Sequence, residues 1–109
     1  MSYDVYLLCP YCKKHDDDEH WWNYTFNISP MLYDKDVNID IKKWDNKKAK
    51  EIISELEEGI KALKANPEKY IAMNPSNNWG DYNTLLSCFL KPMLKAFKEN
   101  PNFIIEVSY

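Results

Sequence analysis

The strongest regular pattern in the chain is a helical one that occupies its middle. Apolar residues recur there at the intervals of three and four that place side chains on one side of a helix. These residues are Ala49, Ile52, Ile53, Leu56, Ile60 and Leu63. The pattern predicts an amphipathic helix that begins near Asn46 and ends at Asn66. Gly59 lies beside the stripe at a cost of about 1 kcal/mol relative to alanine, which predicts the close approach of another segment.

A second helical pattern precedes the end of the chain. Asp81 can cap its first turn, and Pro101 stops it after about Asn100. Its apolar residues are Leu85, Leu86, Phe89, Leu90, Met93, Leu94 and Phe97. Pro92 lies inside this pattern and predicts a kink, or a helix in two pieces, because proline lacks the N–H that a helix uses. Cys88 is expected to be a small buried or half-buried residue beside Phe89.

Strand-like segments stand at both ends of the chain. Tyr3–Leu8 is rich in aromatic and branched residues, and Phe103–Ser108 alternates apolar and polar side chains. Trp21–Ile28 alternates more clearly, with aromatic and apolar side chains toward the core and Asn23, Thr25 and Asn27 on the other face. We therefore expect two strands before the helices and one after them.

Two shorter patterns lie between the strands and the long helix. Ser29 followed by Pro30 is typical of a helix cap and its first turn, which predicts a short helical turn. Further on, Val37, Ile39 and Ile41 alternate with polar residues and suggest a short extra strand.

The order of these elements predicts an α+β fold. We expect a two-layer sandwich in which a small antiparallel sheet of about three strands, in the order β-β-α-α-β, is covered on one face by two main helices. The 109 residues, 45% of them hydrophobic, suit one domain over residues 1–109. The last strand should pair with an early one.

Charge and composition narrow the classes of partner. A net charge of -3 argues against a nucleic-acid partner, because proteins that bind phosphate backbones carry clustered basic residues. No apolar run approaches the length of about 20 residues needed to cross a bilayer, and the start of the chain resembles no leader. The three cysteines, an odd number, fit a reducing compartment. We therefore expect a soluble, intracellular protein without a membrane partner.

Cys9 and Cys12 have the spacing with which two thiolates hold zinc, and His15 and His20 follow closely enough to complete a tetrahedral set. Such a zinc ion would be structural, since four protein ligands leave no position for substrate. Two reduced cysteines in a turn, or a redox pair, fit the same spacing. No other cofactor is expected.

Two polar segments are candidates for recognition. The first is the strand that carries Trp21, Asn23, Thr25 and Asn27, and the second is the segment that carries Asn77, Asn78, Trp79 and Tyr82. Amides and aromatic rings suit recognition by hydrogen bonding and stacking. Plainer interpretations are a solvated sheet face and a turn in which Gly80 adopts a positive backbone angle. No pair of nucleophile and base accompanies these residues, so we expect binding and not catalysis.

Several stretches of the chain together resemble a known group of proteins. They are Tyr3–Leu8, Asn23–Ser29, the helical segment Gly59–Leu63, the segment Asn74–Tyr82, and Asn100-Pro101 followed by Ile105–Ser108. The group comprises small proteins encoded by bacteriophages, prophages and other mobile elements. It is characterised by a Tyr-Asp-Val-Tyr-Leu strand, an Asn-Ile-Thr-Tyr-Asn-type strand and an Asn-Pro-x-Asn-Gly-Trp-Gly-x-Tyr turn. Asn78 stands where that turn usually has glycine, and the glycine-rich segment of many relatives is missing.

This resemblance implies a setting for the protein and the first of two functional hypotheses; the second comes from the two polar segments themselves. In the first, the protein acts in the bacterial host cytoplasm by binding a host protein, as an inhibitor of a defence system would. In the second, it binds a small molecule such as a nucleotide in a pocket near the Asn23 strand and the Trp79 segment.

Overall fold

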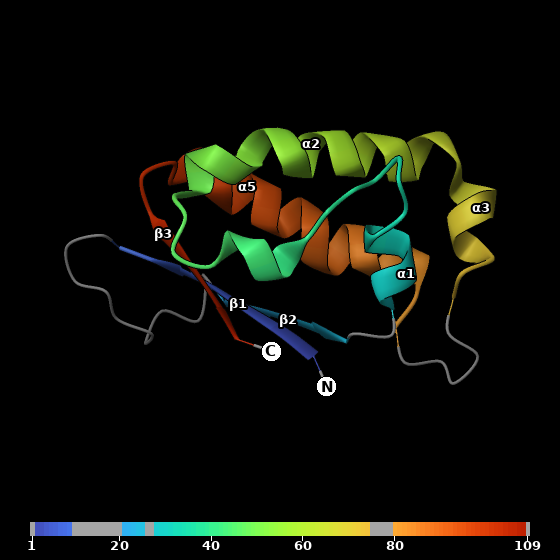
Figure 1. Cartoon of the computed structure of the whole chain (residues 1–109), viewed down its shortest axis with the longest axis horizontal. Coiled ribbons are helices and arrows are strands. Elements are labelled where there is room, and N and C mark those ends of the chain that lie inside the picture. Colours follow the sequence, from blue (N-terminus) through green and yellow to red (C-terminus); the bar gives the residue numbers. More distant parts are fainter. Residues whose placement is uncertain (1, 10–20, 26–27, 75–79, 109) are drawn as a thin grey trace.

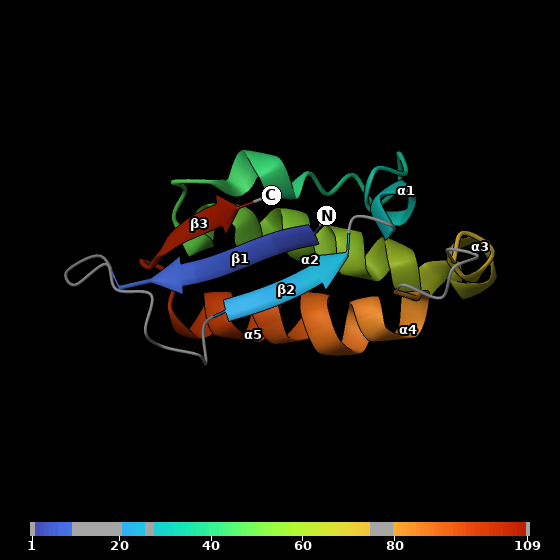
Figure 2. The ribbon, with the colours of Figure 1, turned by 90° about the horizontal axis from the view of Figure 1, so that it is seen from below.

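Three strands form one antiparallel sheet in the order β2-β1-β3. The computed structural model of the chain describes residues 2–9, 21–25, 28–74 and 80–108. Within them, β1 spans Ser2–Leu8, β2 spans Trp21–Thr25 and β3 spans Ile104–Ser108. The first strand lies at the centre and pairs with the last (Figures 1 and 2). The predicted pairing of the terminal strand with an early one is therefore confirmed.

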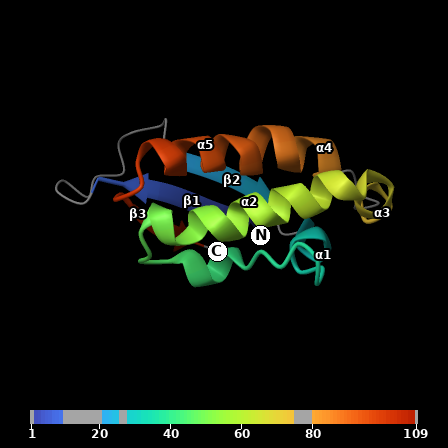
Figure 3. The same cartoon turned by 90° about the horizontal axis from the view of Figure 1, so that it is seen from above.

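Two helical segments cover one face of this sheet. The first is α2, Ala49–Ala65, and the second is a run of α4, Tyr82–Thr84, η4, Leu85–Leu90, and α5, Lys91–Glu99. The shorter elements are α1, Ser29–Leu32, the 3-10 helix η3, Ile41–Trp44, and α3, Pro67–Ile71. Seen from above, α2 and α5 lie in front of the sheet (Figure 3). This arrangement confirms the predicted two-layer α+β fold. Among the described helices, none combines the length and apolar character that crossing a bilayer requires.

The core lies between the sheet and the helices. Val5, Leu7 and Ile105 from the sheet are buried against Leu56 and Phe97 from the helices. The outer edge of β3 is also covered, because the backbone of residues 46–47 exchanges hydrogen bonds of 2.8 Å with Ile105. That contact removes one exposed sheet edge, which would otherwise be a template for aggregation.

The interruption that Pro92 predicts is present as a stretch of π-helix. In η4, the six residues before Lys91, the helix has π character, and the N–H of Lys91 donates to the carbonyl of Leu86, five residues earlier. Pro92 has no N–H to donate to the carbonyl four residues before it. A regular α-helix would therefore lack a hydrogen bond at this point, whichever pattern the preceding residues adopt. The π-helical turns are wider than α-helical ones, and the run then continues as α5.

The alternation at Val37, Ile39 and Ile41 does not produce the extra strand that it suggested. In the structure this stretch is a connection in which Asn38 has a φ of 49° and Ile39 N–H donates to Leu32 O at 2.9 Å. The three apolar side chains are buried. The alternation arises because these side chains are buried in the core next to α2, and not because the segment pairs with another strand.

Two side-chain predictions near the helix ends are corrected. Cys88 is exposed, because the helical turn directs Phe89 inward and its neighbour outward. Ser29 is the first residue of α1 and caps nothing; its hydroxyl lies 2.8 Å from the hydroxyl of Tyr3. That contact joins α1 to the inner face of the sheet.

Gly59 permits the close approach that its position in α2 predicted. An alanine Cβ at this position would overlap Ile39 Cδ1 and lie 2.6 Å from Ile39 Cγ1, and Ile39 is fully buried. The segment that contains Val37 and Ile39 therefore packs directly on the helix backbone.

Replacing Gly59 with alanine should lower the free energy of unfolding by up to about 2 kcal/mol, since overpacking costs about 1 to 3 kcal/mol and helix propensity returns about 1. In an Ile39→Ala background the same replacement should be neutral or stabilising by up to about 1 kcal/mol. Urea denaturation of the four proteins of this double-mutant cycle measures both values. An equal cost in both backgrounds would contradict the proposed contact.

Candidate functional site

The side of the sheet that faces away from the helices carries the first predicted segment. Its residues, which we call the outer sheet face, are those that share this side in the strand register: Ser2, Asp4, Tyr6, Leu8, Trp21, Asn23, Thr25, Ile104, Glu106 and Ser108. No described helix lies over this face (Figure 2). Antiparallel sheets commonly leave one face in water, so an uncovered face is a site only if its side chains form a defined arrangement.

Hydrogen bonds across β1 and β2 give the outer sheet face such an arrangement. The Asn23 side-chain amide donates to Asp4 Oδ1 at 2.7 Å and to Ser2 Oγ at 3.0 Å. The indole N–H of Trp21 donates to the same Asp4 oxygen at 3.3 Å. Asp4 therefore accepts from two side chains of β2 and fixes the orientation of the Asn23 amide.

An aromatic pair lies next to this hydrogen-bonded group. The rings of Tyr6 and Trp21, which are opposite one another in the register, stack with centroids 6.3 Å apart and planes at 11°. Trp21 is 46% exposed, one of three large hydrophobic side chains that are exposed among the described residues. The stack holds an apolar surface in a fixed orientation at the solvent side of the sheet.

The charged groups of the outer sheet face are carboxylates. Asp4 and Glu106 lie on the central strand and on β3, and the residues that define the face include no lysine or arginine. The face therefore offers acceptors and a negative charge beside an aromatic stack. Cationic and hydrogen-bond-donating groups are the chemistry that complements it.

The second predicted segment meets β2 at one end. Gly80 has a φ of 95°, and a Cβ placed on it would lie 2.6 Å from Thr25 Cγ2 and 3.0 Å from Tyr24 Cε1. The Tyr24 hydroxyl accepts the backbone N–H of Asp81 at 3.1 Å and also contacts the hydroxyl of Thr84. The end of β2 and the start of the last helical run are thus joined.

Asp81 caps the helical run that begins beside this contact, as the sequence predicted. Its Oδ1 accepts the backbone N–H of Thr84 at 2.7 Å and the Thr84 hydroxyl at 2.9 Å. These hydrogen bonds hold the pKa of the Asp81 carboxyl below its ordinary value, and the bond from the Thr84 backbone N–H has the larger effect. The cap fixes where the helix starts relative to β2.

Tyr82 belongs to the core and not to the exposed surface. It is 5% exposed, its hydroxyl donates to Leu63 O at 2.7 Å, and its ring stacks on that of Tyr70 with centroids 6.5 Å apart. Burial raises the pKa of its phenol. Among the binding residues that the sequence predicted, the structure therefore places Trp21, Asn23 and Thr25 on the outer sheet face and Tyr82 inside.

The remaining predicted residues lie outside the described part of the chain. These are Asn27, Asn77, Asn78 and Trp79 among the binding residues, and Cys12, His15 and His20 among the zinc ligands. Cys9 is described and half-buried after the end of β1. The zinc site stays a prediction: it requires equimolar zinc in the purified protein that is lost in Cys12→Ser, whereas reduced cysteines or a redox pair require none.

No sequence motif distinguishes the β1 residues of this site. Asp4 and Tyr6 belong to a strand-like segment in which they alternate with the inward-facing Tyr3, Val5 and Leu7. That alternation predicts that both side chains lie on the outer face of the sheet. Which residues of β2 lie beside them depends on the strand register, which the alternation does not give.

Comparison with known proteins gave no match to any family model, to any curated protein or to any solved structure. The resemblance to proteins of phages and other mobile elements therefore stays a prediction. The function has to be argued from the surface itself.

Proposed function

We propose that this protein acts by binding another protein through its outer sheet face. The observation that carries the proposal is the combination of an exposed Trp21 stacked on Tyr6 with the Asp4-centred hydrogen bonds beside it. Tryptophan and tyrosine are among the residues that contribute most to protein interfaces, because they bury a large area at a small entropy cost. Aromatic, amide, hydroxyl and carboxylate groups together suit recognition.

Preorganisation supports this proposal. Trp21 and Asn23 are each held by Asp4 before any partner arrives, so their side chains lose little rotamer freedom on binding. Ordering one rotamer-rich side chain costs about 0.5 to 1.5 kcal/mol in a typical interface. A surface already ordered by its own hydrogen bonds avoids part of that cost.

The charges of the face indicate the chemistry of the partner. A protein segment that presents arginine or lysine could place the cation over the Trp21 and Tyr6 rings and pair with Asp4 or Glu106. A nucleotide would bring its phosphates toward the same two carboxylates, which would repel them. The pockets described below also lie elsewhere, between α2 and α5. The proposal therefore favours a basic protein surface over a nucleotide.

The identity of the partner as a host protein is an inference from the resemblance to phage-encoded proteins. Within that setting, the protein would act in the bacterial cytoplasm, and inhibition of a defence system is the activity that such an origin suggests. The binding surface and the origin are separate parts of the proposal, and the experiment below tests the surface directly.

The experiment compares affinity capture by the natural chain and by Trp21→Ala from bacterial lysate, with retained proteins identified by mass spectrometry. We expect a partner that the natural chain retains and Trp21→Ala loses. For the purified partner, the substitution should weaken binding by about 2 kcal/mol or more, which corresponds to roughly 30-fold in Kd. Raising the salt concentration should weaken the natural complex as well, since charge pairs contribute to it.

A matched control is Tyr33→Ala. Tyr33 is 51% exposed and follows α1, outside the outer sheet face, so its loss removes an exposed aromatic ring from another surface. It should leave the affinity unchanged. Equal retention of the partner by Trp21→Ala and Tyr33→Ala, with both variants folded, would refute the outer sheet face as the binding surface.

A further inference from the structure

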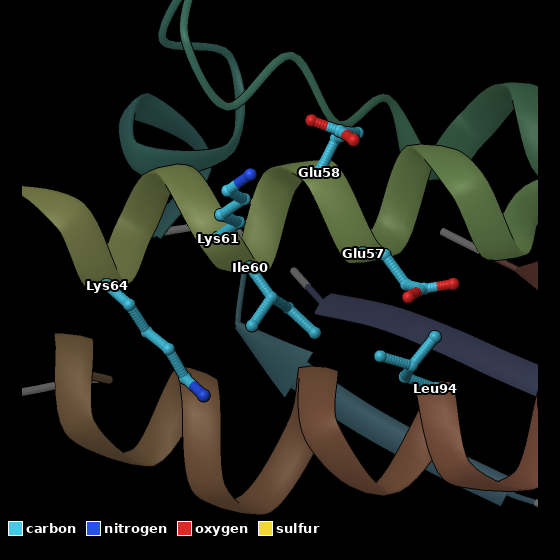
Figure 4. A pocket seen from close by; sticks show the side chains of 6 residues that line it. All are labelled: Glu57, Glu58, Ile60, Lys61, Lys64 and Leu94. Carbon is cyan, nitrogen blue, oxygen red and sulfur yellow. The ribbon is translucent and has the colours of Figure 1, made fainter.

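A second surface lies on the opposite side of the molecule, where α2 and α5 pack side by side. A groove opens between these two helices, away from the sheet, with pockets of about 440 and about 330 Å³ along it. Ile60 from α2 and Leu94 from α5 point toward one another at its floor, and Lys64 extends from α2 toward α5 (Figure 4). The groove has an apolar floor and charged walls.

The walls carry two rows of lysines. On α5, Lys91, Lys95 and Lys98 follow one another at intervals of four and three residues, which place them along one side of the helix. On α2, Lys61 and Lys64 are three residues apart and belong to the opposite wall. All five are exposed, so their ammonium groups are in contact with water.

This accumulation of positive charge contrasts with the chain as a whole. Five lysines line the groove, together with Glu57 and Glu58 at one end, in a protein of net charge -3. At that end Lys98 pairs with Glu57 at 3.5 Å. Among the described residues, none of the other four lysines has a carboxylate partner within ion-pair distance. Their charges are available to a ligand.

We infer that this groove binds an acidic amphipathic helix of a partner protein. An apolar line flanked on both sides by lysines is complementary to a helix whose apolar stripe is flanked by glutamates or aspartates. Helices commonly dock in this way, with residues at i, i+3, i+4 and i+7 as anchors in a groove. Charges beside the seam then set partner choice and orientation, as in coiled coils.

The shape of the groove favours a helix over other anionic ligands. From Glu57 to Lys64 it follows α2 for about two turns, or roughly 10 Å at 1.5 Å per residue, which is the length over which a docked helix places its anchors. A third helix can lie along two packed helices with its side chains in the gap between them. A membrane surface or a nucleic-acid backbone would contact the lysines and leave the recessed Ile60 and Leu94 without a partner.

The test uses a synthetic peptide of about 18 residues, long enough to form a helix, with leucine at the anchor positions and glutamate on both sides. We expect the full-length protein to bind it and to bind at least tenfold more weakly a scrambled peptide of the same composition, or one with serine at the anchors. Lys64→Glu combined with Lys91→Glu should weaken binding by at least tenfold, because like charges would then face one another.

The control variant changes the net charge equally at another place. Lys35 and Lys50 are exposed and line neither pocket, so Lys35→Glu combined with Lys50→Glu should keep the affinity within about threefold. Melting temperatures show that both double variants are folded. The inference is overturned if the scrambled peptide binds equally, if the two double variants behave alike, or if anionic vesicles, duplex DNA or a second copy of the chain bind the groove more tightly than the peptide.

Discussion

Replacing Trp44 with alanine should lower the free energy of unfolding by about 3 to 5 kcal/mol, the usual cost of removing a large aromatic side chain from a core. Trp44 is fully buried in η3, its ring packs edge-on against Phe97 with centroids 6.0 Å apart, and its indole N–H donates to Glu55 Oε2 at 2.6 Å. The variant would lose this packing and leave the Glu55 carboxylate without its donor. Such a loss is a large part of the 5 to 15 kcal/mol that typically stabilises a domain.

The change in free energy is measured by urea denaturation. It is read from the shift of the unfolding midpoint, provided that the slope m of the free energy against urea concentration is unchanged. Trp21→Ala is the matched control, because it makes the same chemical change at a side chain that is 46% exposed; it should cost only about 0.5 to 1.5 kcal/mol, the usual contribution of an aromatic pair. Trp44→Phe should fall between the two, since it keeps a ring and loses the hydrogen bond. A cost below about 1 kcal/mol for Trp44→Ala would contradict the described core.

Replacing Gly80 with alanine should lower the free energy of unfolding by about 2 to 5 kcal/mol. Part of this cost, about 1 to 2 kcal/mol, comes from a φ of 95°, which L-residues with a Cβ avoid. The rest, about 1 to 3 kcal/mol, comes from overlap of the new Cβ with Thr25 Cγ2 at 2.6 Å and its close approach to Tyr24 Cε1 at 3.0 Å. Either the Gly80 backbone or the end of β2 would have to move.

The two contributions can be separated. Thr25→Ser removes the Cγ2 methyl group, so in that background Gly80→Ala should recover the overlap cost, about 1 kcal/mol or more, and retain the backbone cost. Gly59→Ala provides the second comparison, because Gly59 lies within α2, where alanine is favoured over glycine. If Gly80→Ala were no more costly than Gly59→Ala, the backbone strain assigned to Gly80 would be refuted.

The two proposed binding surfaces can be tested independently because they lie on opposite sides of the molecule. The outer sheet face is on the side of the sheet away from the helices, whereas the lysine groove is lined by α2 and α5, which form the layer on the other side of the sheet (Figures 1 and 3). Trp21→Ala should therefore leave peptide binding at the groove unchanged. The double change of Lys64 and Lys91 should likewise leave the partner of the outer sheet face bound.

The sequence by itself determined the local features of this protein. The apolar stripe of α2, the cap at Asp81 and the interruption before Pro92 each depend on residues within a few positions of one another, so periodicity and backbone chemistry predicted them. The roles of the two glycines also followed from local rules, since a residue without a Cβ adopts a positive φ, or lets another segment approach closely, at no steric cost. The order of these elements then predicted the α+β class.

The tertiary structure alone decided which distant residues meet. The pairing of Asp4 with Asn23, and of Tyr6 with Trp21, depends on a register that a shift of one residue would have reversed, and no short-range pattern fixes it. The lysine groove depends on α2 and α5 lying side by side, which joins residues about thirty positions apart. The stretch around Ile39 alternates like a strand, yet it is a buried connection because α2 and not another strand lies beside it. Periodicity indicates which side of a segment is buried. Which other segment of the chain packs against that side depends on the tertiary structure.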